Sequence, residues 1–236
     1  MHIFYITEVI GEITHLNSEE SRHAVKVLRL KKGDILRAVD GKGGFYTAEI
    51  LNADPISCKL KIVSLQKEFE KKHSYLHIAI APTKNIDRFE WFVEKTAEIG
   101  INEITPMLTE HSERKNIKNE RLKKILIAAM KQSGRAYLPI MNPMISFSEF
   151  LINCSQKSKF IAHCHEKPKQ PLIKLLKNSE DICIMIGPEG DFSHDEVVKA
   201  NNNGFESVTL GSHRLRTETA GIVACTIVNI AKESNL

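Results

Sequence analysis

The segment ICIMIGPEGDFS, residues 182–193, decides the fold. Its first five residues form an unbroken apolar run, which is typical of a strand that a parallel sheet buries on both faces. A glycine-bearing turn follows, and then a helix that Ser193 caps, with Glu196 in the capping-box position. Ligands of open α/β sheets bind beyond the carboxyl ends of strands, so we interpret this turn as a binding loop. The alternative is a tight structural turn, because short motifs also match by chance.

A second segment, VTLGSHRLRTETA at residues 208–220, repeats this order of elements. An apolar strand ends at a glycine turn, which leads into a helix with Thr217 as the expected N-cap. The turn also concentrates the charged or titratable side chains of His213, Arg214 and Arg216. A purely structural turn does not need such a density, so the two loops together are predicted to form one site.

The rest of the chain divides into a β-rich part and an α/β part. Short, partly alternating strands over residues 1–66 predict a small β domain, and the charged residues 67–73 predict a linker. From residue 76 onward, strand and helix patterns alternate, which predicts an α/β domain with a mainly parallel sheet.

One helix within the β-rich part carries a basic face. Asn17 is its expected cap, and the helical spacing places Arg22, Lys26 and Arg29 on one side while Val27 turns inward. With two further lysines these side chains form a candidate set for binding phosphates: Arg22, Lys26, Arg29, Lys31 and Lys32. The alternative is a helix face that only solvent contacts.

The last helix, residues 218–232, is apolar on nearly every side. A helix that is apolar all round is buried all round, so we expect it to pack against its own domain and against a second copy of the chain. The alternative is the central helix of a monomer.

Composition excludes several classes of protein. The 236 residues are 42% hydrophobic, and no apolar run approaches the roughly 18 residues that a membrane span requires. The N-terminus does not resemble a signal peptide, and the five cysteines include no CxxC pair, so we expect a cytoplasmic protein in a reducing compartment. The cluster His163-Cys164-His165 lacks a second ligand pair, so no metal site is expected. The net charge of +4 excludes a polycation.

Four segments together resemble the SPOUT methyltransferases, and specifically the RsmE-type family of 16S ribosomal RNA (uracil-N3)-methyltransferases. The resemblance extends over the whole chain and differs from the usual family pattern at His111, where arginine is usual, and at Asp191, where a second glycine is common. The segments that carry it are IGPEGDFS at 186–193, LGSHRLRTETA at 210–220, RHAVKVLR at 22–29 and QSGR at 132–135.

The resemblance implies an α/β protein of two domains. A small PUA-like β-barrel that binds RNA would occupy residues 1–70, and a SPOUT methyltransferase domain would occupy residues 74–236. A C-terminal trefoil knot would lie at about residues 160–232, and the C-terminal helix would form a homodimer. The implied reaction transfers a methyl group from S-adenosyl-L-methionine (SAM) to N3 of uridine 1498 in the 16S RNA of the small ribosomal subunit.

Site residues also follow from the resemblance. The implied SAM pocket contains His163, Gly187, Pro188, Glu189, Gly190, Leu210, Gly211, Leu215, Arg216, Thr219 and Ala220.

The chemistry requires a proton acceptor and a fixed cation. Loss of the N3 proton leaves an anion whose charge lies on two carbonyl oxygens of uracil. Arg216 is the candidate cation, and Arg135 is expected to join it across the dimer. Glu218 either orients Arg216 or accepts the proton, and the sequence leaves both roles open. An ion pair between them that only braces the loop is the alternative.

Two competing functions remain at this point. One is SPOUT-type ribose 2′-O methylation of another RNA, and the other is a non-catalytic RNA-binding assembly factor. A Rossmann-type methyltransferase is disfavoured because no GxGxxG follows an early strand.

Overall fold

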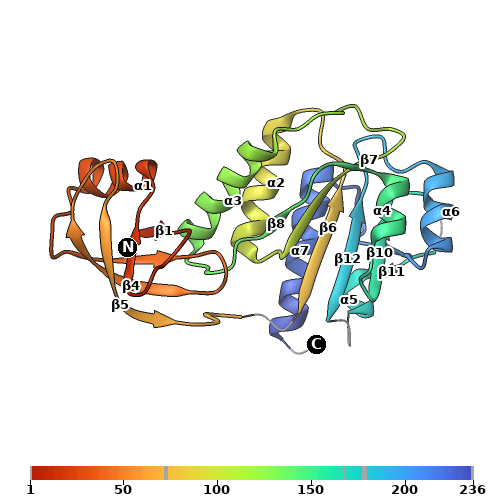
Figure 1. Ribbon diagram of the computed structural model, residues 1–236. Helices are drawn as coiled ribbons and strands as arrows, with labels where there is room; N and C mark the ends of the chain where they lie inside the picture. Colours follow the sequence, from red (N-terminus) through yellow and green to blue (C-terminus); the bar gives the residue numbers. More distant parts are fainter. Residues whose placement is uncertain (1, 72–73, 167, 177–179, 235–236) are drawn as a thin grey trace. The chain divides into compact units, whose positions relative to one another are not determined.

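The computed structural model describes residues 2–71, 74–166, 168–176 and 180–234, which divide into two compact units (Figure 1). Unit 1 comprises Met1–Lys71 and Ile127–Leu138, and unit 2 comprises Lys72–Leu126 and Pro139–Leu236. The sequence patterns did not assign residues 127–138 to the first part of the chain. The domain limits 1–70 and 74–236 remain a prediction about parts that fold independently.

Unit 1 is built on a five-stranded sheet with the order β1-β3-β4-β5-β2. β1 and β3 run parallel, and the other pairs are antiparallel. Every second residue of the central strand β4 is buried, because side chains alternate between the two faces of a sheet. The strands are β1 (Ile3–Tyr5), β2 (Ile13–His15), β3 (Ile35–Val39), β4 (Phe45–Asn52) and β5 (Lys59–Gln66).

The basic helix of unit 1 differs from the prediction. The Asn17 side chain caps α1 (Ser18–Arg22) as expected, but a π-helical turn, η1 (His23–Val27), follows. The Val27 side chain is 66% exposed instead of inward, and Arg29 has a left-handed backbone with φ of 58°. A π turn holds more residues than an α turn, so the side chains are spaced around the axis differently from the predicted α-helical periodicity.

Two further segments complete the core of unit 1. The helix α3 (Asn119–Ser133) begins in unit 2 and ends in unit 1, where Met130 packs with Val39. Phe69, within the predicted linker, stacks on Phe45 with ring centroids 4.4 Å apart. This part of the predicted linker is therefore packed against unit 1, whereas residues 72 and 73 lie outside the described residues.

Unit 2 contains an eight-stranded sheet with the order β11-β13-β10-β12-β6-β7-β8, and β9 pairs with β7. All pairings between its described strands are parallel, which confirms the predicted α/β class. Its strands are β6 (Tyr75–Ile80), β7 (Glu103–Leu108), β8 (Ile140–Met141), β9 (Ile145–Ser146), β10 (Ser158–Ala162), β11 (Gln170–Pro171), β12 (Asp181–Ile186) and β13 (Glu206–Thr209).

Helices lie on both sides of this sheet (Figure 1). On one side α7 (Thr217–Glu233) packs against α2 (Ile86–Ile99), β6 and β12. Gly221 of α7 permits this approach, since a Cβ atom there would lie 2.5 Å from the Phe92 ring. The opposite side carries α4 (Phe147–Asn153) and α6 (His194–Asn202). The short helix α5 (Leu172–Leu175) contacts α7. Within the described residues, no helix combines the length and apolar character needed to cross a membrane.

A partly buried polar network lies at the amino-terminal ends of β6 and β7. The His77 side chain is 4% exposed, and its Nε2 lies 2.7 Å from Thr105 Oγ1. The Glu103 carboxylate accepts hydrogen bonds from Tyr75 (2.7 Å) and Asn142 (2.6 Å). Burial lowers the pKa of His77 and raises the pKa of Tyr75.

Candidate functional site

A pocket of about 330 Å³ opens at the carboxyl ends of the neighbouring strands β13, β10 and β12 of unit 2. Because these strands are parallel, the loops that follow them meet at one edge of the sheet. The pocket is lined by Ala162, His163, Cys164, Ile186, Gly187, Pro188, Glu189, Asp191, Val208, Thr209, Leu210, Gly211, His213, Arg214, Leu215, Arg216, Thr217 and Ala220.

The structure brings most of the predicted cofactor residues together. Gly190 and Thr219 belong to the same segments but are not among the lining residues. Sequence reasoning assigned no binding role to Cys164 or Thr217, and each of them adjoins a residue that it did select. The predicted residues that line the pocket are His163, Gly187, Pro188, Glu189, Leu210, Gly211, Leu215, Arg216 and Ala220.

The loop after β12 is a tight turn in close contact with its surroundings. The Asp191 amide donates to the Pro188 carbonyl across 2.9 Å, which closes a four-residue turn. A Cβ atom on Gly187 would lie 3.1 Å from the Phe192 ring, so only glycine fits there without a shift. Ser193 and Glu196 form the predicted capping box at the start of α6. The turn is therefore anchored at both ends.

Glu189 connects this turn to the loop after β6. Its Oε1 accepts a hydrogen bond of 3.0 Å from the backbone amide of Lys84. Arg114 donates to the carbonyl oxygens of Thr83 and Lys84 in the same loop. The loop that follows a fourth strand, β6, therefore contacts the loop after β12 at the pocket.

The start of α7 differs from the prediction by one residue. Arg216 occupies the N-cap position with an extended backbone, and Thr217 is the first helical residue, buried to 4% exposure. The Arg216 side chain makes no capping hydrogen bond, because it has no acceptor oxygen. Arg216 is exposed and lines the pocket, so its guanidinium is accessible to a ligand there.

Glu218 is buried beside the pocket but is not one of its lining residues. Its Oε1 lies 3.9 Å from Nε of Arg88 on α2, and its Oε2 has no hydrogen-bond partner among the described residues. Arg135, the third predicted catalytic residue, belongs to unit 1. The catalytic roles of all three side chains remain predictions.

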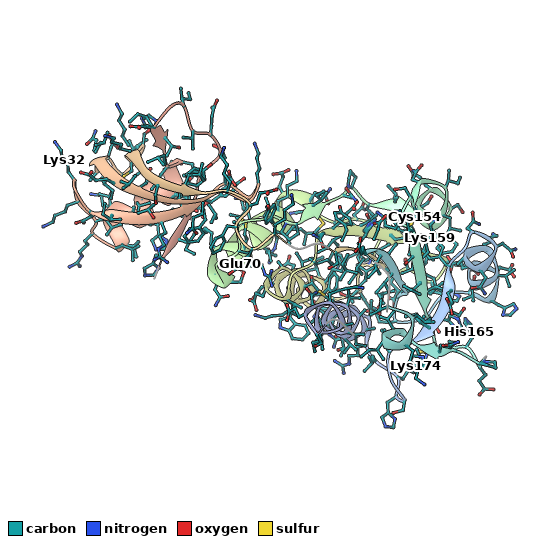
Figure 2. All side chains as sticks on the ribbon, turned by 90° about the horizontal axis from the view of Figure 1, so that it is seen from below. Lys32, Glu70, Cys154, Lys159, His165 and Lys174 are labelled. Atoms are coloured by element: carbon teal, nitrogen blue, oxygen red, sulfur yellow. The ribbon has the colours of Figure 1, made fainter. Side chains whose placement is uncertain are left out.

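The predicted phosphate-binding residues are all exposed on unit 1: Arg22, Lys26, Arg29, Lys31 and Lys32. Figure 2 shows Lys32 pointing away from the ribbon of this unit. In the part of the chain that the structure describes, no group of three His, Cys, Asp or Glu side chains is arranged to hold a metal ion.

Comparison with known proteins identifies the family. Residues 70–229 match the RNA methyltransferase domain, and residues 16–63 match the RNA methyltransferase PUA domain. The chain is 35% identical over 235 residues to ribosomal RNA small subunit methyltransferase E of Rickettsia conorii, which covers 96% of this chain and 94% of that protein. The chain belongs to the ribosomal RNA small subunit methyltransferase E family. The predicted family is therefore confirmed.

Solved structures of this family agree with the fold. A probable rRNA-methyltransferase from Porphyromonas gingivalis superimposes with a TM-score of 0.90 at 38% identity, covering 99% of both chains. Ribosomal RNA small subunit methyltransferase E from Neisseria gonorrhoeae, bound to S-adenosyl methionine, superimposes with a TM-score of 0.88 at 28% identity, covering 98% of this chain and 97% of that one. The mixed α/β fold with a PUA domain is confirmed.

Proposed function

We propose that the protein transfers the methyl group of SAM to N3 of uridine 1498 in 16S ribosomal RNA of the small ribosomal subunit. The observation that carries this proposal is the pocket at the carboxyl ends of β10, β12 and β13. It is lined by the two loops whose sequences resemble the family motifs. The Neisseria gonorrhoeae relative, whose structure contains SAM, supports the choice of cofactor.

The residues of the pocket fit SAM. A volume of about 330 Å³ lies within the range of roughly 300–1,000 Å³ that is usual for small-molecule sites. Ile186, Val208 and Leu210 supply apolar surface for a purine ring, and the tight backbone at Gly187 allows close approach of a ligand. When bound, SAM supplies an electrophilic methyl group on a sulfonium.

The protein's part in this reaction is to position two reactants and to stabilise charge. Arg216, exposed at the pocket wall, would hold the developing negative charge on the uracil carbonyl oxygens. Arg135 of a second copy of the chain would add a second positive charge near these oxygens. The burial of Glu218 and its ion pair with Arg88 favour a role in holding the start of α7 over direct proton transfer.

RNA recognition is proposed for unit 1. Cations on its surface would contact phosphates around the target, while base chemistry on N3 requires an unpaired or flipped uridine. The exposure of the five basic side chains from Arg22 to Lys32 supports this assignment.

A homodimer through α7 is proposed as well. Ile230 is 51% exposed, and Ile222, Val223 and Ile227 are only half-buried within one chain. A stripe of this kind is typical of an interface. Sedimentation velocity should therefore give a dimer for the native chain and a monomer for Ile230→Asp, and a monomeric native chain would overturn the proposal.

We also propose the trefoil knot at about residues 160–232. Its support is family membership together with the order of the strands. β13 pairs with β10 on the side away from β12, yet the next element, α7, packs against β6 and β12. The chain after β13 must therefore return across the sheet beside the pocket loops.

The decisive experiment compares 16S RNA from cells with and without the protein by nucleoside mass spectrometry. We expect N3-methyluridine to be lost in its absence and restored by the purified protein with SAM. If the RNA from cells without the protein instead lacks a ribose-methylated nucleoside, the protein catalyses 2′-O methylation. Absence of SAM binding in calorimetry would indicate a non-catalytic assembly factor.

A further inference from the structure

The Asp191 carboxylate links the loop after β12 to a neighbouring loop. One oxygen, Oδ2, accepts a hydrogen bond of 2.7 Å from the backbone amide of Cys164. The other, Oδ1, accepts from the amide of Phe192 at 2.9 Å. Cys164 follows β10 whereas Asp191 follows β12, so a single carboxylate joins two of the loops that form the pocket.

The backbone of Asp191 has a conformation that few residue types adopt without a cost. Its φ of 65° lies in the left-handed region, which glycine adopts freely and other L-residues adopt at a cost. Aspartate is among the side chains that tolerate this region, because its short polar group can hydrogen-bond locally. The two amide–carboxylate bonds offset the cost, since hydrogen bonds to a charged acceptor are stronger than neutral ones.

His111 holds the same loop from the turn that follows β7. Its Nδ1 lies 3.1 Å from the Gly190 carbonyl oxygen and 3.0 Å from that of Asp191, and it donates between them. A Cβ atom on Gly190 would be 3.0 Å from Cβ of His111, so the two segments are in direct contact. The two positions at which this sequence departs from the usual family pattern thus meet in space.

The same two segments are connected a second time through Glu196. Its Oε1 accepts from the Glu110 amide at 2.9 Å, while its Oε2 accepts from the Ser193 amide in the capping box. This connection does not involve Asp191 or His111. We therefore expect it to persist when either side chain is replaced.

We propose that Asp191 and His111 are positioning residues that form a clasp around the 187–191 turn and hold it in the conformation that shapes the SAM pocket. The inference rests on the proposed SAM-dependent function. A binding loop that is ordered beforehand loses less conformational entropy when the ligand binds, so the clasp acts on affinity. Both oxygens of Asp191 already accept from backbone amides, which favours positioning over direct contact with the cofactor's positive charge.

Two substitutions at Asp191 separate positioning from folding. Asp191→Asn keeps the size and the left-handed backbone but offers one acceptor oxygen to two amides. Asp191→Gly removes both bonds and also removes the backbone cost. The matched control is Asp195→Asn, which makes the same change of charge at an exposed position of α6 outside the pocket.

Calorimetry with SAM and thermal melting measure the two effects. We expect Asp191→Asn to weaken SAM binding roughly tenfold or more, and Asp191→Gly at least as much, while the Tm of Asp191→Gly stays within a few degrees of the native value. At saturating SAM, the kcat of Asp191→Asn on RNA should change by less than about threefold, because the loss of SAM affinity raises the KM for SAM instead. Native affinity in both variants, or a loss that Asp195→Asn shares, would overturn the clasp.

A double-mutant cycle tests whether the two side chains act as one clasp. His111→Ala should weaken SAM binding by itself, and in combination with Asp191→Asn the loss should be smaller than the product of the single losses, since either change frees the same turn. Losses that multiply would show two independent contacts and would contradict a single clasp.

Hydrogen–deuterium exchange without ligand distinguishes failure of the clasp from failure of the proposed function. The amides of Cys164 and Phe192 should exchange slowly in the native protein and faster in Asp191→Gly. Equal exchange refutes the clasp whatever the cofactor is. Faster exchange in a protein whose native form does not bind SAM refutes the proposed function and leaves the clasp standing.

Discussion

The two edges of the unit 2 sheet both gather titratable side chains, but they use them differently. At the amino edge, His77 is buried and Glu103 is partly buried, and both hydrogen-bond to neighbouring protein groups. At the carboxyl edge, His213, Arg214 and Arg216 are exposed and face a pocket. A group whose partners are all protein atoms stabilises the fold, whereas a group that faces an open cavity is available to a ligand. The comparison separates structural from functional charge where residue type alone does not.

The largest effect should come from the carboxyl edge. Arg216→Ala should lower kcat by roughly a hundredfold or more, because removing one preorganised donor for a developing oxyanion typically costs that much. SAM affinity in calorimetry should change only a few-fold. Equal losses in kcat and in SAM affinity would contradict a catalytic role, and Lys199→Ala, which removes an exposed cation of α6 outside the pocket, is the control.

The amino edge should respond in stability alone. Glu103→Ala removes the acceptor for the part-buried donors of Tyr75 and Asn142, while Asn142 keeps Thr105 Oγ1 as a partner at 2.7 Å, so the free energy of unfolding should fall by about 1–2 kcal/mol. Denaturant titration measures this loss. Below the lowered Tm, kcat and KM should stay near native values, and a large fall in kcat would show that the two edges are coupled.

Charge reversal on unit 1 should affect RNA and not SAM. Arg22→Glu and Lys26→Glu should each weaken RNA binding several-fold, and each should reduce the slope of log K against log salt by about one. Filter binding across a salt series gives both values. Unchanged slopes would mean that solvent alone contacts these side chains.

The two edges should also respond to pH in opposite directions. Burial lowers the pKa of His77 in the folded protein below its ordinary value of 6.5. The unfolded chain therefore binds the proton first, and stability should fall as the pH drops below about 6.5 toward the folded pKa. Denaturant titrations between pH 5 and 8 test this, and His77→Gln should flatten the dependence.

At the carboxyl edge the sign is reversed. Hydrogen bonds to the carbonyl oxygens of Asp191 and Gly190 raise the pKa of His111 above 6.5, with a contribution from the nearby carboxylates of Glu110 and Glu196. The protonated ring donates more strongly, so SAM affinity should fall by about two- to threefold as the pH rises through the raised pKa. His111→Gln, which donates at every pH, is the control, and a flat native profile would contradict the effect.

Much of the fold could be predicted because local signals agreed with the tertiary structure. The apolar run at residues 182–186 is a strand buried between layers of helices, and Ser193 caps the following helix with Glu196 as expected. Most cofactor residues predicted from the two motifs line one pocket, because the carboxyl ends of parallel strands meet at one edge.

The errors share a physical cause. A π turn at 23–27 and a cap at Arg216 instead of Thr217 depend on a few backbone hydrogen bonds that helical periodicity does not reveal. Residues 127–138 pack with unit 1 because the end of a long helix carries Met130 into its core, a contact between positions far apart in sequence. The network around His77 and Glu103 also joins distant segments, so spacing along the chain does not predict it.

By itself the sequence determined the α/β class, the family and the two loops of the site, since each is encoded in contiguous residues. Only the tertiary structure decided which side chains meet. It placed Arg216 at the pocket and Glu218 against Arg88, and it brought Asp191 together with Cys164 and His111. Contacts between distant segments depend on how strands are ordered in the sheet, and spacing along the chain does not carry that order.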